Sequence, residues 1–165
     1  MKIVQKKVCL LGDFAVGKTS LIRRYVEGRF DDRYLTTVGV AVSRKTIEYP
    51  SLSLHLLLWD LAGGRDYSQS GYLTGVAGAM IVCDLTREST LSSYHLYANQ
   101  LRQINRDVRL TLLANKADLS EERAISEEQL NALAQEIRAP LLYTSAKTGE
   151  NVEQAFKALS DLLVE

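Results

Sequence analysis

Short apolar runs alternate with amphipathic stretches along this chain. The runs VCLLG (8–12), AMIVCDL (79–85), LTLLAN (110–115) and PLLYTS (140–145) have the length and composition of buried strands. Other apolar residues recur at three- and four-residue spacing and predict helices: Leu21, Ile22, Tyr25 and Val26; Leu91, Tyr94, Ala98, Leu101 and Ile104; Leu130, Leu133, Ala134 and Ile137; and Val152, Ala155, Phe156, Leu159 and Leu163. Ser126 and Gln129 form a capping box at the start of the third of these helices.

A hairpin is predicted in the N-terminal half. VGVAVSRKTIEY (38–49) and SLSLHLLLW (51–59) flank Pro50, and the second arm places leucine at every other position from Leu52 to Leu58. Strands that alternate with helices indicate a mostly parallel sheet covered on both faces. We therefore expect a doubly wound α/β fold with a six-stranded sheet, one antiparallel edge strand and about five helices.

The composition is that of one ordinary globular domain covering residues 1–165. The 20 basic and 20 acidic residues balance, which argues against a nucleic-acid-binding face. Cys9 and Cys83 lie in apolar runs and are expected to be buried, reduced thiols. The start MKIVQKK lacks the apolar core of a signal peptide, no run approaches the roughly 20 residues of a membrane span, and the end DLLVE offers no cysteine for prenylation. We expect a cytoplasmic protein with no membrane anchor in this chain.

The segment GDFAVGKT (12–19) fits the phosphate-binding motif G-x-x-x-x-G-K-[ST] and lies between an apolar strand and an amphipathic helix. Gly12 and Gly17 let backbone N–H groups wrap a phosphate, and the helix that begins near Lys18 directs its positive end at the anion. Lys18 is expected to reach the β- and γ-phosphate oxygens, and the Thr19 hydroxyl to bind Mg²⁺. These features predict a P-loop NTPase.

Asp60 ends the second arm of the hairpin, in the stretch WDLAGGRD (59–66). A carboxylate in this place can hold a water on Mg²⁺, as the Walker-B acid does. Taken alone, an aspartate at a strand end is more often a turn or cap residue. The neighbouring P-loop favours the metal role.

Two tetrapeptides that follow predicted strands indicate which base is bound. NKAD (115–118) and TSAK (144–147) fall on the same sheet edge as the P-loop, where open α/β sheets bind ligands. The Asp118 carboxylate can accept both N–H donors of the guanine edge, a pair that adenine lacks. Asn115 can bond a purine nitrogen or tie neighbouring loops together, while Lys116 and Lys147 can lay their aliphatic stems on the ring. The pattern favours guanine.

The order of these motifs resembles a small GTPase of the Ras superfamily, most similar to the Rab branch, over essentially all 165 residues. YLTTVGV (34–40) resembles the Rab switch I run, and YLTGVAGAMIVCDLT (72–86) resembles the segment after switch II. YTSAKTGENVEQAF (143–156) is very close to the Rab guanine-loop and final-helix signature. The resemblance implies a GTP- and GDP-binding switch with Mg²⁺, a role in signalling and vesicle transport, and a monomer that meets effectors, exchange factors and activating proteins through its two switches.

The resemblance also implies roles for individual residues. Thr37 would bind Mg²⁺ and contact the γ-phosphate, Gly63 would give the γ-phosphate an N–H, Phe30 would pack on the guanine, and Tyr34 would cover the phosphates. Ser145 and Ala146 would contact the guanine oxygen through their backbone. The expected nucleotide contacts are completed by the P-loop and base-loop positions Asp13, Phe14, Ala15, Val16, Gly17, Lys18, Thr19, Ser20, Asn115, Lys116, Asp118 and Lys147.

Three departures from the family pattern surround the γ-phosphate. Gly64 stands where the family has the glutamine that orients the attacking water, so loss of intrinsic hydrolysis is favoured over substitution by Arg65 or Asp66. Phe14 replaces a small residue and would either crowd the approach of a partner's arginine finger or turn outward onto a switch. Switch II, from Asp60 to Gly75, is about two residues shorter than in a Rab, which predicts an abbreviated helix.

We therefore expect a guanine-nucleotide switch with slow hydrolysis, in which Lys18, Thr37, Gly63 and Gly64 occupy the catalytic positions. The alternatives are a nucleotide-locked pseudo-GTPase that serves as an interaction module, and a P-loop kinase or ATPase. Asp118 and TSAK speak against the last of these.

Overall fold

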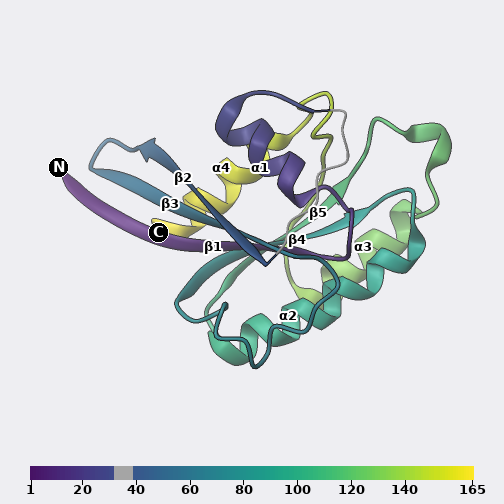
Figure 1. Ribbon diagram of the computed structural model, residues 1–165, viewed down its shortest axis with the longest axis horizontal. Coiled ribbons are helices and arrows are strands. Elements are labelled where there is room, and N and C mark those ends of the chain that lie inside the picture. The colour runs from purple at the N-terminus through teal and green to yellow at the C-terminus, as the bar shows by residue number, and fades with distance from the viewer. Residues whose placement is uncertain (32–38) are drawn as a thin grey trace.

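The computed structural model describes residues 1–31 and 39–165 (Figure 1). Its strands form one six-stranded sheet in the order β2-β3-β1-β4-β5-β6. The strands are β1 (Lys2–Gly12), β2 (Val40–Glu48), β3 (Leu52–Leu61), β4 (Val76–Asp84), β5 (Arg109–Asn115) and β6 (Leu141–Tyr143). All neighbouring pairs are parallel except β2 and β3, so the predicted mostly parallel sheet with one antiparallel edge strand is confirmed.

The described residues form four α-helices and two short 3₁₀ helices, where about five helices were expected. The α-helices are α1 (Lys18–Glu27), α2 (Ser92–Ile104), α3 (Glu127–Ile137) and α4 (Val152–Leu163), and the 3₁₀ helices are η1 (Glu88–Leu91) and η2 (Ser120–Glu122). The abbreviated switch II helix is absent: residues 65–75 form turns and irregular backbone instead. The capping box of α3 is present, since Ser126 Oγ accepts from Gln129 N at 3.1 Å and Gln129 Oε1 accepts from Ser126 N at 2.9 Å.

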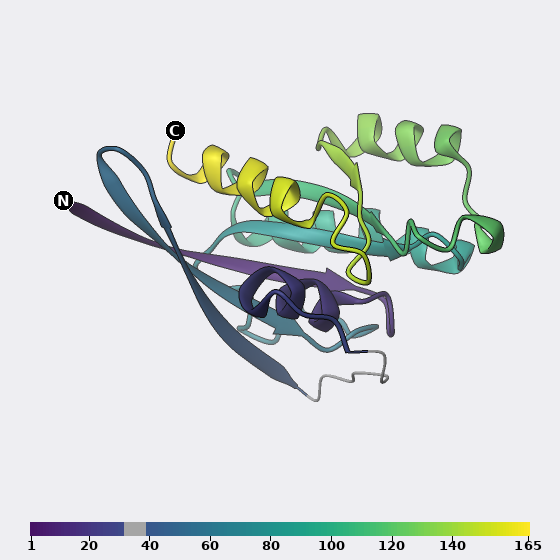
Figure 2. The same ribbon diagram turned by 90° about the horizontal axis from the view of Figure 1, so that it is seen from above.

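The helices cover both faces of the sheet, with α1 and α4 on one side and α2 and α3 on the other (Figure 1). The unbroken apolar run in β1 follows from its place in the middle of the sheet. Val8 and Leu10 join the core under α1 and α4, while Cys9 and Leu11 join the core under α2 and α3. The β2–β3 hairpin extends beyond the helices, and the N-terminus lies beside its tip (Figure 2). The central sheet is therefore buried on both faces.

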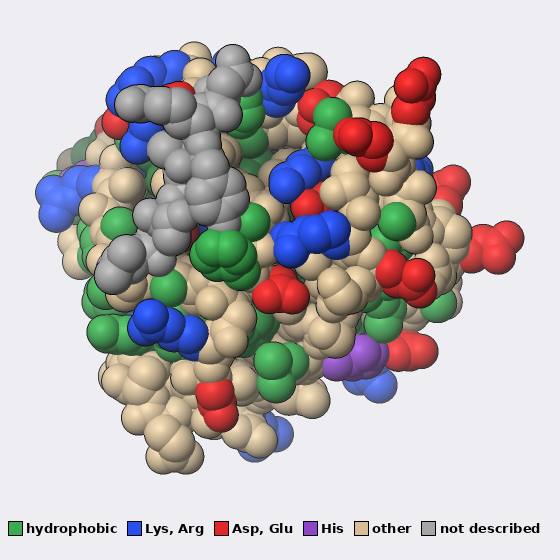
Figure 3. All heavy atoms as spheres, turned by 45° about the vertical axis from the view of Figure 1, so that its right-hand side comes forward, with side chains coloured by type: hydrophobic (Ala, Val, Ile, Leu, Met, Phe, Trp, Pro, Cys, Tyr) green, Lys and Arg blue, Asp and Glu red, His purple; other side chains and the backbone are tan. Residues whose placement is uncertain are grey.

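Both cysteines are buried and free, as expected. Burial raises the pKa of Cys9 to about 12 and that of Cys83 to about 11, so neither thiol ionises readily. On the face seen in Figure 3, acidic side chains are most frequent toward the right-hand side, and most basic side chains lie at the centre and left. Within the described part of the chain, no helix is long and apolar enough to span a membrane.

Candidate nucleotide-binding site

The carboxyl ends of the parallel strands bring the sequence motifs to one edge of the sheet. The register pairs Leu10 with Asp60, Gly12 with Val82, and Asp84 with Asn115, so the ends of the strands lie along that edge in the order β3, β1, β4 and β5. The P-loop follows β1, and the NKAD loop follows β5. Ligands of open α/β sheets bind at such an edge.

The P-loop has a conformation that glycine makes possible. Gly17 has a φ of +105°, in the region that favours glycine, and a Cβ added there would lie 2.3 Å from Asn115 Nδ2. The same amide nitrogen donates to the Val16 carbonyl at 2.9 Å. The motif glycine therefore lets the NKAD loop approach the P-loop backbone closely.

Lys18 begins α1 with its side chain largely removed from water, at 6% exposure for the residue. Its Nζ donates to the Asp13 carbonyl at 3.0 Å. Burial lowers the pKa of Lys18 to about 8, against the opposing effect of the Asp60 and Asp13 carboxylates. A buried ammonium at the start of a helix is suited to donate hydrogen bonds to phosphate oxygens.

The two described candidates for the metal site meet directly. Thr19 Oγ1 donates to Asp60 Oδ2 at 2.5 Å, and Asp60 is 4% exposed. A hydroxyl and a carboxylate are hard oxygen ligands, so the pair fits Mg²⁺, which takes few protein ligands and completes its shell with water and phosphate. The third candidate, Thr37, lies outside the described residues, as does Tyr34.

The NKAD and TSAK loops are joined by side-chain hydrogen bonds. Asn115 is buried, and its Oδ1 accepts from Thr144 Oγ1 at 3.1 Å while its Nδ2 holds the P-loop. Asp118 Oδ1 accepts from Ser145 Oγ at 2.7 Å. Of the two roles considered for Asn115, the structure shows the tie between loops. The NKAD loop, the TSAK loop and the P-loop therefore form one hydrogen-bonded unit.

Arg24 on α1 supports the TSAK loop, a role that the sequence pattern did not reveal. Its Nε donates to the Ala146 carbonyl at 2.8 Å and its Nη2 to the Lys147 carbonyl. Ala146 is buried, and the Ser145 amide donates to the Glu150 carbonyl at 3.1 Å. Arg24 lies off the apolar face that the helical spacing predicts for α1. Only the fold brings the TSAK loop beside its side chain.

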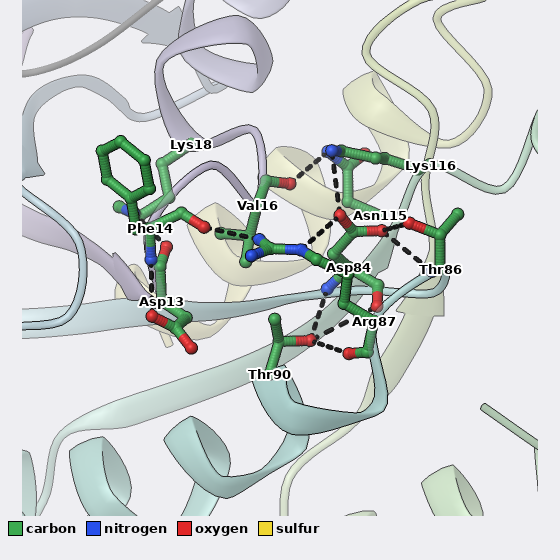
Figure 4. A network of polar contacts seen from close by, with 10 residues as sticks. All are labelled: Asp13, Phe14, Val16, Lys18, Asp84, Thr86, Arg87, Thr90, Asn115 and Lys116. Carbon is green, nitrogen blue, oxygen red and sulfur yellow. Dashed lines mark hydrogen bonds and ion pairs between the residues drawn. The ribbon is translucent and has the colours of Figure 1, made fainter. Parts of the chain in front are cut away.

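Asp84, at the end of β4, is a second buried carboxylate, and it lies outside the sequence motifs described above. Its Oδ2 accepts from Lys116 Nζ at 2.9 Å and from Arg87 Nε at 3.1 Å, and Arg87 Nη2 donates to the Phe14 carbonyl (Figure 4). The signal was available in the sequence, because Asp84 ends an apolar strand just as Asp60 does. Lys116, with a left-handed φ of +68°, thus directs its ammonium to Asp84.

Backbone groups dominate the region of Gly63 and Gly64. A Cβ on Gly63 would lie 2.6 Å from the Asp13 carbonyl oxygen and from Phe14 N, so only glycine fits against the P-loop. Gly64 has a φ of +71°, and its N–H donates to the Gly12 carbonyl at 3.2 Å. Switch II therefore touches the P-loop through its main chain.

The residues that follow Gly64 are engaged elsewhere. Asp66 Oδ1 accepts from Ser68 N at 2.8 Å and from Ser68 Oγ at 2.6 Å. The Arg65 carbonyl accepts from Tyr97 Oη at 2.6 Å, and Tyr67 N donates to a side-chain oxygen of α2 at 3.0 Å. This part of switch II is fastened to α2 and to itself.

The two described aromatic candidates differ in burial. The Phe14 side chain is half exposed, and its ring points to the same side of the P-loop as Lys18 (Figure 4). Phe30 is partly buried and packs on the core under α1 and α4. Phe14 therefore stays at the surface of the P-loop, where it can meet an approaching partner.

One edge of the sheet carries a P-loop with a buried lysine, the Thr19–Asp60 pair, and the joined NKAD and TSAK loops. This combination is typical of a nucleotide-binding protein of the P-loop α/β class. Residues 7–165 match the Ras family. The chain belongs to this family of small GTPases and is Rab-like.

Three relatives illustrate the similarity. The Ras-related protein RABD2a of Arabidopsis thaliana is 37% identical over 157 residues, which cover 93% of this chain and 77% of the relative. The GTP-binding protein YPTM1 of Zea mays is 36% identical over 157 residues, covering 93% and 76%. The Ras-related protein Rab-22A of Mus musculus is 35% identical over 163 residues, covering 97% and 84%.

Proposed function

We propose that residues 1–165 act as a single G domain, a guanine-nucleotide switch whose intrinsic GTP hydrolysis is slow. The observation that carries this proposal is the Asn115 side chain, which joins the P-loop carbonyl of Val16 to Thr144 in the TSAK segment. One buried amide thus joins the loop that would bind the phosphates to a loop that would bind the base. This connection supports a nucleoside di- or triphosphate as the ligand.

The base would be selected by the second loop pair. Ser145 donates to Asp118, which orients a carboxylate at the sheet edge. Asp118 would accept the two N–H groups of the guanine edge, while the TSAK backbone held by Arg24 would face the guanine oxygen. An adenine base would leave the carboxylate with no donor pair, which is costly in a desolvated place.

The phosphates would be held by charge and backbone. Lys18 would exchange the Asp13 carbonyl for phosphate oxygens, and the N–H groups of residues 13–20 would surround the β-phosphate. Thr19, Asp60 and Thr37 would hold Mg²⁺. When bound, the ion neutralises the phosphate charge that the single Lys18 ammonium leaves uncompensated.

The switch itself would be read through the backbone. Gly63 would donate its N–H to the γ-phosphate, and Thr37 would join the γ-phosphate from the other side. Loss of that phosphate would release both segments, so that effectors, exchange factors and activating proteins could distinguish the two states. The Rab resemblance supports a role of this switch in vesicle transport.

Slow hydrolysis is supported by the surroundings of Gly64. The position has no side chain, and the neighbouring Asp66 carboxylate accepts from Ser68. Orienting the attacking water requires a group that both donates and accepts, and such a group typically contributes about 10²–10⁴-fold. The same observation favours a second candidate, a nucleotide-locked pseudo-GTPase that uses the fold as an interaction module.

Nucleotide competition and single-turnover hydrolysis test these proposals. We expect GDP and GTP to displace a fluorescent guanine nucleotide while ATP does not, and we expect GTP loaded on the protein to decay slowly. Equal competition by ATP would refute the guanine assignment. Fast decay without a partner would refute slow hydrolysis, and no decay at all would select the locked pseudo-GTPase.

A further inference from the structure

Arg87, in the turn after β4, reaches from a buried carboxylate to the P-loop. Its Nε donates to Asp84 Oδ2 at 3.1 Å, and its Nη2 donates to the main-chain carbonyl of Phe14 (Figure 4). Arg87 and Phe14 are 73 positions apart in the sequence. One planar guanidinium therefore links the end of β4 to the loop that follows β1.

Asp84 is a firm anchor for this link because it is buried and charged. It is 1% exposed, and Oδ1 accepts from Thr86 N at 2.8 Å and Thr86 Oγ1 at 2.7 Å, while Oδ2 accepts from Lys116 and Arg87. Burial by itself would raise the pKa of Asp84, but hydrogen bonds from Lys116 and Thr86 outweigh it and hold the pKa below its ordinary value. The carboxylate stays anionic and binds both cations.

The backbone that carries Arg87 is also fixed. Arg87 N donates to the Asp84 carbonyl at 3.0 Å. The hydroxyl of Thr90, which is fully buried, donates to the Arg87 carbonyl at 2.7 Å and accepts from Asp84 N at 3.0 Å. The side chain of Arg87 therefore starts from a closed turn and needs little ordering to reach the P-loop.

We propose that Arg87 is a positioning residue of the nucleotide site, which holds the P-loop at Phe14 and thereby slows nucleotide release. The inference rests on the proposed guanine-nucleotide function and deepens it. Asn115 already holds the Val16 carbonyl at 2.9 Å. Two carbonyls of the P-loop, two residues apart, are thus fixed from the β4 and β5 side, and both fix the direction of the N–H groups that face the phosphates.

The link also connects the base to the phosphates. Lys116, whose stem would lie on the base in the proposed complex, shares Asp84 Oδ2 with Arg87. Loss of Arg87 leaves Lys116 on Asp84 but frees the P-loop at Phe14. Release of GDP and of GTP should accelerate together, because the P-loop N–H groups would contact phosphates that both nucleotides carry.

The test is release of a fluorescent GDP analogue into excess GDP with Mg²⁺, for wild type, Arg87→Ala and Arg87→Lys. We expect release from Arg87→Ala to be roughly tenfold faster, the change for losing one charge-assisted hydrogen bond. A lysine can pair with Asp84 as a point charge but lacks the fork that reaches two acceptors, so Arg87→Lys should release nearly as fast as Arg87→Ala.

Arg102→Ala is the matched control. Arg102 also donates from Nη2 to a main-chain carbonyl, that of Ile137 at 2.6 Å, but it joins α2 to the end of α3. Its removal should change the melting temperature without changing the release rate. Because Arg87→Lys keeps the charge beside Asp84, it serves as the folded variant if the alanine variant does not fold.

Several outcomes would overturn the inference. Release from Arg87→Ala within twofold of wild type would exclude the tie, as would full rescue by lysine, which would reduce the role of Arg87 to neutralising Asp84. Acceleration equal to that of Arg102→Ala would show general destabilisation. A change in GTP hydrolysis with unchanged release would assign Arg87 a different role. Failure of the wild type to bind guanine nucleotides would refute the proposed function itself.

Discussion

Placing a glutamine at Gly64 tests whether one missing side chain is what slows hydrolysis. The backbone there has a φ of +71°, and a non-glycine residue in this conformation costs roughly 1–2 kcal/mol. A Cβ at this position would lie 3.4 Å from Asp13 Oδ1, at the edge of ordinary contact. We therefore expect Gly64→Gln to fold, with a melting temperature lowered by about 2–4 °C for each kcal/mol lost.

The gain in rate depends on whether the new amide reaches the water. A well-placed group of this kind contributes about 10²–10⁴-fold, or roughly 3–5 kcal/mol of transition-state stabilisation. The Arg65 carbonyl and Tyr67 N are bonded to α2, which restrains the backbone after Gly64, so we expect only about 10-fold for Gly64→Gln alone. Adding Phe14→Gly, which removes a half-exposed ring from the P-loop, should increase the gain.

Gly64→Ala is the control, since it has the same backbone cost and no amide. The assay is single-turnover phosphate release from protein loaded with GTP, with melting temperatures measured on the same samples. Equal rates for the alanine and glutamine variants, with Phe14→Gly present in both, would refute the assignment of position 64. A wild-type rate as fast as that of the double variant would also refute it and would direct attention to Arg65 and Asp66.

Two further predictions concern binding, and a third concerns stability. Asp118→Asn replaces an acceptor with a donor, so competition assays should show a shift from guanine toward xanthine nucleotides; unchanged preference would contradict the base assignment. Chelating Mg²⁺ should speed GDP release, measured by fluorescence, because Thr19 and Asp60 then lose the ion that joins them to phosphate; equal rates with chelator and with excess Mg²⁺ would exclude the metal site. The pKa of Asp84 is held low, so its stabilising contribution is present at neutral pH and is lost as the pH falls below about 4. Asp84→Asn should therefore have a lower free energy of unfolding than wild type at neutral pH, and it should lose less of that free energy below about pH 4. Denaturant titrations at neutral pH and below about pH 4 measure both differences. Equal losses of stability in the two proteins would contradict this role of Asp84.

The sheet, and the meeting of the P-loop with the NKAD loop at one of its edges, were predictable because their signals are local. Apolar runs, helical spacing and the turn at Pro50 indicate the strands, the helices and the hairpin within short windows of sequence. The turns that replace a switch II helix could not be predicted in this way, because some of their hydrogen bonds are made with α2. Tyr97 Oη donates to the Arg65 carbonyl, and Gln100 Oε1 accepts from Tyr67 N. Local propensity was overridden there by tertiary contacts.

The polar links between loops were also beyond the sequence. Arg24 contacts a carbonyl 122 positions away, and Arg87 contacts one 73 positions away. Both hydrogen bonds are accepted by backbone carbonyls, which every residue has. The type of the accepting residue therefore gives no signal of the contact in the sequence. Only the strand order, which places β4 beside β1, brings the Arg87 turn to the P-loop.

The contrast that we propose between nucleotide binding and slow hydrolysis rests on where side chains contribute at this edge of the sheet. Lys18, Asp60 and Asn115 are each no more than 6% exposed, and each is held by a hydrogen bond from or to another loop or helix. Position 64 contributes only a main-chain N–H, which donates to the Gly12 carbonyl, so in our proposal the γ-phosphate is contacted by the N–H of Gly63. A backbone N–H can register the presence of a phosphate, because donation alone suffices for that. Aligning a water requires acceptance as well, so we infer that this stretch of the chain detects the γ-phosphate far better than it removes it.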